Sequence, residues 1–188
     1  MTASPRHLSA TELKAGLPDV LDSPRDNGPL QAIVVRPATN KRQHVNSARL
    51  TPEGGIDGDR WVHDSYYRLE DGRPDPRSQV SLMNARFLRL IARQDDAICL
   101  AGDNLVVDLD LSEENLPAGS RLAVGSVVLE ISELPHTGCS KLASRYGDEA
   151  RQFMNNARGK SLHLRGRYAR VVVGGTISVG DIVSKVRP

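Results

Sequence analysis

The sequence has few aromatic residues, few cysteines and no long hydrophobic run. Aromatic residues make up 4% of the 188 residues, so Val, Leu, Ile and Ala must form most of the core. Two cysteines, Cys99 and Cys139, make no disulfide framework and fit a reducing compartment. No apolar run approaches the ~20 residues of a membrane span, and the first residues lack the apolar segment of a secretory signal. We therefore expect a soluble cytoplasmic protein, most of it in one domain.

Positive charge is concentrated in the C-terminal part of the chain. From His136 to the end there are ten Lys and Arg residues against three acidic residues, whereas the preceding part has a net charge of −5. This asymmetry favours an anionic partner. Because no DNA- or RNA-binding motif is present and stacking aromatics are scarce, a small phosphate-bearing ligand fits better than nucleic acid. A merely solvated basic face is the alternative that charge alone leaves open.

The apolar pattern predicts one helix followed by many short strands. Residues 9–21 have a capping box from Ser9 and Glu12 and an apolar stripe, but Pro18 should shorten or break this helix. A second helix is expected over residues 84–94, and residues 65–78 read as a polar surface excursion. Strands are expected over residues 30–36, 79–83, 105–109, 121–124, 127–131, 168–173, 176–179 and 182–186. This pattern predicts a mainly β barrel or sandwich, preceded by a helical extension over residues 1–29.

Two glycines lie in the strongest β segment of the chain. Gly174 and Gly175 separate two β-branched runs, which predicts a hairpin turn between residues 168–173 and 176–179.

The segment Pro-His-Thr-Gly-Cys-Ser-Lys, residues 135–141, carries the strongest chemical signal. Cys139 follows a glycine, three residues after His136 and two before Lys141. Apolar residues follow at helical spacing through Met154, so Cys139 should open a helix. A helix N-terminus and nearby cations favour thiolate over thiol, and thiolate attacks electrophiles, carries sulfane sulfur and binds soft metals. A loop cysteine without a role is the alternative reading.

Seven short motifs occur in a fixed order along the chain. They are GIDGDRW (55–61), RSQVSLM (77–83), GDNLV (102–106), PAGSRL (117–122), PHTGCSKL (135–142), LRGRYARV (164–171) and GGTISVGD (174–181). Together they resemble the MOSC domain, named for the C-terminal domain of molybdenum cofactor sulfurases, over residues 30–188. The resemblance implies a mainly antiparallel β-barrel with a few short helices.

The resemblance also implies chemistry at Cys139. The matching cysteine of the family bears a persulfide or ligates molybdenum, depending on the member. Some relatives bind molybdopterin and reduce N-hydroxylated compounds, and longer ones are fused to a pyridoxal-phosphate cysteine desulfurase that supplies sulfur. We accordingly expect Cys139 and His136 to be catalytic, Cys139 to be the metal ligand, and a cysteine desulfurase or a redox protein to be the partner.

A molybdopterin phosphate would need cations or backbone N–H donors around it. The residues expected to bind the cofactor are Asp59, Arg60, Arg77, Lys141, Arg165 and Arg167. On a strand, Arg165 and Arg167 would face one side and Arg170 the other.

Other interpretations stay open. His136 and Cys139 have H-x-x-C spacing, but no second close pair completes a zinc site. Cysteine hydrolase chemistry would require a base converging on Cys139. Cys99 lies between two apolar residues and is expected to be a buried small hydrophobe. A delivery module without turnover and a barrel that binds a different anion without molybdenum are the alternative functions. The excursion over residues 65–76 is expected to be either a lid or a partner surface.

Overall fold

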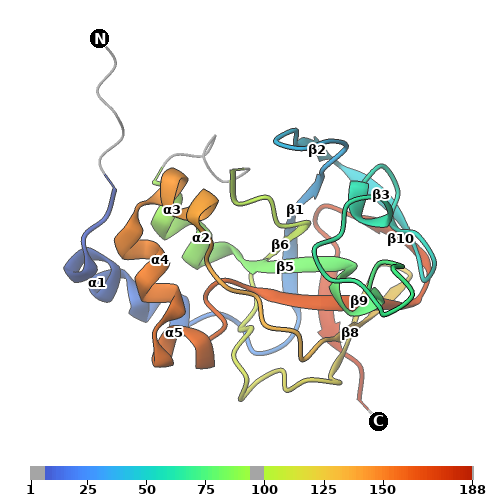
Figure 1. The fold of residues 1–188 in the computed structure, drawn as a ribbon. Helices are drawn as coiled ribbons and strands as arrows, with labels where there is room; N and C mark the ends of the chain where they lie inside the picture. The colour runs from blue at the N-terminus through green and yellow to red at the C-terminus, as the bar shows by residue number, and fades with distance from the viewer. Residues whose placement is uncertain (1–6, 94–99, 188) are drawn as a thin grey trace.

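The computed structural model describes residues 7–93 and 100–187 (Figure 1). The expectation for Cys99 lies outside the described residues. None of the described helices is long and apolar enough to cross a membrane.

Seven strands close into a barrel, as the sequence predicts. The order around the barrel is β11-β7-β8-β9-β5-β6-β1, and β1 pairs with β11 to close it. All these pairings are antiparallel except the one between β5 and β6. The strands are β1 (Gly28–Val35), β5 (Val80–Asn84), β6 (Leu105–Val107), β7 (Arg121–Val124), β8 (Val127–Ile131), β9 (Arg167–Val173) and β11 (Ile182–Lys185), and β2 (Gln43–Val45) pairs with the end of β1.

A second, three-stranded sheet overturns the predicted Gly174–Gly175 hairpin. It consists of β10 (Gly175–Ser178), β3 (Ser47–Thr51) and β4 (Gly55–Ile56), in that order. The chain therefore leaves the barrel after β9 and pairs with β3 instead of folding back. Neither glycine has a positive φ; a Cβ on Gly175 would lie 2.2 Å from Ser126 Oγ, and one on Gly174 would lie 2.9 Å from the Leu50 carbonyl oxygen. These glycines permit close backbone approach, which alternating apolar patterns do not reveal.

The helices gather on one side of the barrel (Figure 1). They are α1 (Ala10–Leu21), α2 (Ala85–Ala92), α3 (Ser140–Tyr146), α4 (Asp148–Asn155) and α5 (Ala157–Ser161), with short 3₁₀ turns η1 (Arg60–Val62) and η2 (Pro76–Ser78). Helix α1 begins with the predicted capping box, but the predicted break at Pro18 is wrong. Leu13, Leu17 and Val20 are buried in the hydrophobic core between the helices and the barrel. Their burial offsets the loss of the backbone hydrogen bond that Pro18 cannot donate.

Two hydrophobic cores result, one inside the barrel and one under the helices. Strand β5 joins them, because Val80 and Leu82 point into the barrel whereas Met83 points into the helical layer. The helix predicted to follow Cys139 is in fact two helices, since the chain turns at Gly147 with φ of 95°. That backbone conformation is available mainly to glycine, so Gly147 ends α3. The apolar residues keep their helical spacing on both sides of this break, which is why the sequence predicted a single helix.

Candidate functional site

Cys139 lies on the surface, directly before α3. Its side chain is exposed, and its carbonyl oxygen accepts hydrogen bonds of 3.1 Å from the N–H groups of Leu142 and Ala143. The cysteine therefore opens the helix, as predicted from the spacing of the apolar residues. An exposed thiol at a fixed backbone position is accessible both to a ligand and to another protein.

The loop before Cys139 is fixed from two sides. The Asn155 side chain in α4 accepts a hydrogen bond from Gly138 N–H and donates one to the Gly138 carbonyl oxygen, both at 2.9 Å. On the other side, the Tyr67 hydroxyl donates to the Pro135 carbonyl oxygen at 2.8 Å. Tyr67 belongs to the excursion over residues 65–76, so this excursion contacts the cysteine loop and helps to position it.

The side chain of His136, in the same loop, points inward and is buried. Its side chain is 8% exposed, and its ring lies against that of Tyr168 with centroids 4.2 Å apart. Nε2 is 3.8 Å from Asp103 Oδ1, beyond hydrogen-bonding distance, and Nδ1 has no partner. Burial, followed by the positive charges of Arg165 and Arg36, lowers the pKa of His136 well below its usual value. The imidazole is therefore neutral at neutral pH.

Asp103 and Arg165 form an ion pair next to this imidazole. Arg165 Nη1 donates to both carboxylate oxygens of Asp103, at 2.9 and 2.8 Å. Burial raises the pKa of Asp103, and the charge of Arg165 opposes that rise. Burial also raises the pKa of Tyr168 to about 12, so the phenol next to His136 keeps its proton. His136, Tyr168, Asp103 and Arg165 together are called the polar centre. It combines a neutral imidazole, a protonated phenol and one internal ion pair.

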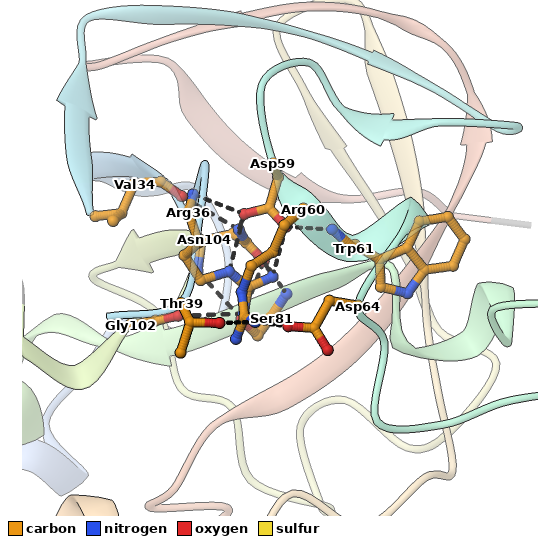
Figure 2. A network of polar contacts seen from close by, with 10 residues as sticks. All are labelled: Val34, Arg36, Thr39, Asp59, Arg60, Trp61, Asp64, Ser81, Gly102 and Asn104. Atoms are coloured by element: carbon orange, nitrogen blue, oxygen red, sulfur yellow. Dashed lines mark hydrogen bonds and ion pairs between the residues drawn. The ribbon is translucent and has the colours of Figure 1, made fainter. Parts of the chain in front are cut away.

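A second ion pair, between Arg36 and Asp59, anchors the loops beside the centre (Figure 2). Asp59 is almost fully buried and accepts five hydrogen bonds, three from Arg36, one from Trp61 N–H and one from Asn104 Nδ2. Arg36 also donates to the Gly102 carbonyl oxygen at 3.3 Å. Because Asp59 has so many donors within the chain, its clearest role is to hold the loops that carry the other residues.

The remaining residues predicted to bind a cofactor differ in their surroundings. Arg60, in η1, pairs with Asp64, which follows that turn. Arg77 pairs with Asp75 and Glu133, both at 2.6 Å. Lys141 is exposed.

Arg165 and Arg167 have different partners, although simple strand alternation would place them together. Arg167 is buried and donates to Glu113 at 2.9 Å, whereas Arg165 is bound to Asp103. Gly166 between them has φ of 96°, which interrupts the alternation of a strand.

Three side chains that each carry an unpartnered buried nitrogen lie around Gly102 and Asp103. Among the residues that the structure describes, the buried side-chain nitrogens without a hydrogen-bond partner are Arg42 Nε, His136 Nδ1 and Arg165 Nε. Arg165 binds Asp103, and His136 approaches it. Arg42 lies against Gly102, where an added Cβ would be 3.1 Å from its Nε. Buried polar atoms are rarely unpaired, so these three side chains are the candidates for contact with a ligand.

A small cavity of about 120 Å³ adjoins this centre. Its lining includes Arg36, Arg60, Trp61 and Tyr66, and Tyr168, which also contacts His136. Tyr66 is 92% exposed at the rim. The cavity thus lies between Tyr168, which contacts His136, and the start of the 65–76 excursion.

Sequence reasoning did not single out Arg36, Arg42, Asp103, Tyr168 or Asn155. Asp103 and Tyr168 lie inside motifs that were recognised, so only their roles were missed. Arg36, Arg42 and Asn155 reach the site from outside those motifs, through tertiary contacts that local sequence does not encode.

A family model for the MOSC domain matches residues 72–184, more than half of the chain. The chain belongs to the MOSC domain family. No curated protein matches the sequence.

Solved structures share the MOSC fold seen here. YiiM from Escherichia coli aligns with a TM-score of 0.56 and 20% identity, covering 86% of this chain and 70% of that one. The YuaD protein from Bacillus subtilis aligns with a TM-score of 0.58 and 18% identity, covering 86% and 97%. YiiM from Geobacillus stearothermophilus aligns with a TM-score of 0.54 and 18% identity, covering 85% of this chain and 75% of that one. At these identities the likeness concerns the fold alone.

Proposed function

We propose that this MOSC protein binds the molybdenum cofactor, molybdopterin, at the centre beside Cys139 and uses it to reduce N-hydroxylated compounds. The observation that carries the proposal is that three described side chains with an unpartnered buried nitrogen, Arg42, His136 and Arg165, lie around Gly102 and Asp103, next to the loop of an exposed cysteine. The unpaired N–H donors of Arg42 and Arg165 favour an anionic ligand with several acceptor atoms.

The donor set fits a metal that brings most of its own ligands. Within the described ranges no group of three or more His, Cys, Asp or Glu side chains could hold a metal ion. Cys139 therefore offers a single sulfur ligand, which suits a soft metal whose other ligands come from the cofactor. The same scarcity of ligands argues against a zinc site among these residues.

The chain's own residues would supply protons and position the ligand. When bound, the cofactor would supply the two electrons needed to reduce an N–O bond. That reduction also consumes two protons and releases water. His136 is neutral, so its ring has one N–H and one nitrogen lone pair, and it would relay a proton by accepting it at one ring nitrogen and releasing another from the second nitrogen. The ion pair with Arg165 holds Asp103 beside that ring.

A second candidate function is a sulfur carrier with a persulfide on Cys139. The exposed thiol favours this candidate, because sulfur transfer requires direct contact between Cys139 and the cysteine of a donor protein. A cysteine desulfurase would be the partner in that case, whereas a redox protein would be the partner of the reductase.

Metal analysis and intact mass would separate these functions. Protein should be purified without oxygen from a host that makes the cofactor, as wild type, Cys139→Ser and Cys99→Ser. The proposal expects molybdenum in wild type and in Cys99→Ser, and its loss in Cys139→Ser. A mass gain of about 32 Da on wild type and Cys99→Ser alone, without metal, would instead indicate a persulfide.

Two results would contradict the cofactor proposal. One is a wild-type protein without molybdenum from a host shown to load another molybdenum enzyme. The other is a Cys139→Ser protein that keeps the metal at the wild-type level, since the thiolate is the only protein ligand proposed.

A further inference from the structure

An apolar cavity of about 150 Å³ lies between the helices α1, α4 and α5. Figure 1 shows these helices side by side on one side of the barrel. Its walls include four apolar side chains, those of Leu17, Phe153, Leu162 and Leu164. Leu17 and Leu164 belong to the hydrophobic core between the helices and the barrel, whereas Phe153 and Leu162 are only partly buried against it. The cavity is therefore a place where this core is open to the surface.

The backbone around the cavity is held by close contacts at Gly159. An added Cβ at Gly159 would lie 2.2 Å from the Phe153 carbonyl oxygen and 2.6 Å from that of Met154, so only glycine allows α5 to approach the end of α4 this closely. Asn156 caps α5, because its Oδ1 accepts a hydrogen bond of 2.8 Å from Gly159 N–H. These contacts fix α5 against α4, and the cavity is preformed.

Two cations lie at the rim of this cavity. Lys14 and Arg158 both line it and are exposed to solvent. Within the described residues neither forms an ion pair, and none of the side chains that line the cavity is acidic. Asn156 also lines the cavity, and its Nδ2 makes no hydrogen bond within the same part of the chain. Apolar walls are thus combined with positive charge and an unused N–H donor at the mouth.

We propose that this cavity binds a small carboxylic acid with an apolar ring, of which benzoate is the simplest aromatic example. Apolar cavities of this size accommodate benzene, so the ring would fill the space between the leucines and Phe153. The carboxylate would meet Arg158, whose planar fork of N–H groups matches two carboxylate oxygens, with Lys14 as a second positive charge. None of the residues that line this cavity belongs to the polar centre or lines the cavity beside Tyr168. The inference therefore does not depend on the proposed function.

An NMR titration of the full chain with benzoate tests the site, at constant pH and ionic strength. We expect saturable shifts of backbone amide signals in residues 14–17 and 153–164, with a dissociation constant of about 1 mM or lower. Acetate lacks the ring and benzyl alcohol lacks the charge, so each should bind about fivefold or more weakly than benzoate.

Two pairs of variants locate the ligand within the cavity. Leu162→Trp should fill the cavity and weaken benzoate binding about tenfold or more, whereas Leu162→Met, which keeps the side-chain volume, should change it little. Arg158→Gln should weaken binding about fivefold, because a charge-assisted hydrogen bond is lost. Lys160→Gln is its control, since Lys160 is exposed on the same helix but does not line the cavity. Arg158→Gln leaves the apolar walls intact, so it tests the site even if Leu162→Trp disturbs the fold.

The inference is overturned if wild type shows no saturable shifts in these two segments at millimolar benzoate. Benzyl alcohol binding as tightly as benzoate would rule out a carboxylate ligand, and equal affinity in Arg158→Gln and wild type would do the same. Cys139→Ser should bind benzoate as wild type does, so this site can stand even if no molybdenum is found.

Discussion

The amide of Asn155 holds Gly138 by both of its backbone polar groups. Asn155 Oδ1 accepts from Gly138 N–H and Nδ2 donates to the Gly138 carbonyl oxygen, each at 2.9 Å. An added Cβ at Gly138 would lie 3.2 Å from Arg151 Cγ, so the loop packs tightly on α4. The backbone next to Cys139 is thus fixed by a helix that follows it in sequence by fewer than twenty residues.

Replacing Asn155 by alanine should release this loop. Two hydrogen bonds are lost and Gly138 N–H is left without its partner, which should cost about 1–3 kcal/mol of unfolding free energy. Hydrogen exchange at Gly138 should accelerate while the barrel strands stay protected. Gln152→Ala is the control, because Gln152 lies on the same helix and bonds only the exposed Asp148. Unchanged exchange at Gly138 in Asn155→Ala would show that other contacts fix the loop.

Replacing Asp59 by asparagine should destabilise the whole protein. Asp59 has a side chain only 1% exposed and accepts three hydrogen bonds from Arg36, whose charge would lose its partner. Removing one member of a buried ion pair costs about 3–5 kcal/mol, which urea denaturation would measure. Asp64→Asn is the control, since the Asp64 side chain is 60% exposed and its pair with Arg60 should contribute about 1 kcal/mol or less. Similar losses in the two variants would contradict the anchoring role of Asp59.

The barrel was predictable because its strands are short, apolar and separated by clear turn signals. The Val124–Val127 hairpin pairs as the sequence predicts, with Val124 opposite Val127. The prediction of a hairpin turn at Gly174–Gly175 was wrong because these glycines permit close approach to Leu50 and Ser126. Neighbours so distant in the sequence leave no local signal. The break at Gly147 was missed because apolar spacing continues on both sides of it.

The candidate site was only partly predictable. Cys139 and His136 were found because they lie close together in one short motif. Strand alternation suggested a shared side for Arg165 and Arg167, but Gly166 interrupts the strand geometry and the two arginines have different partners. Arg42 reaches Gly102 from a distant loop, and only the folded chain determines that contact.

His136 should make stability depend on pH. Its pKa in the folded protein is well below its usual value, chiefly because of burial, whereas the unfolded chain should titrate near pH 6.5. As the pH falls below about 6.5, the unfolded chain therefore binds a proton that the folded protein does not, and stability is lost. The groups facing this imidazole are Asp103, Arg165, Arg36, His163 and Tyr168.

His136→Phe keeps an aromatic ring against Tyr168 and removes this titration. Between pH 6.5 and pH 5, the variant should lose up to about 2 kcal/mol less unfolding free energy than wild type, as measured by urea denaturation at each pH. Burial also lowers the pKa of His163, with the same sign, but that contribution is common to both proteins. Parallel pH profiles would mean that His136 gains its proton in the folded state as easily as in the unfolded chain.

Tyr67 should couple the 65–76 excursion to the cysteine loop. Its hydroxyl donates to the Pro135 carbonyl oxygen at 2.8 Å, and its ring meets Tyr168 edge to face with centroids 5.8 Å apart. Tyr67→Phe keeps the ring contact and removes the hydrogen bond, which should cost about 1 kcal/mol. The excursion and the loop at Pro135 should then exchange amide hydrogens faster together.

Tyr66→Phe is the matched control for this coupling. Tyr66 is the adjacent residue, is 92% exposed and should tolerate the loss of its hydroxyl with little change in stability. If Tyr67→Phe accelerated exchange in the excursion but left residues 135–139 unchanged, the hydrogen bond to Pro135 would not position Cys139. Faster amide exchange both in residues 65–76 and in residues 136–139 would instead show that the excursion supports the cysteine loop. A lid without contacts to the loop would not affect exchange there.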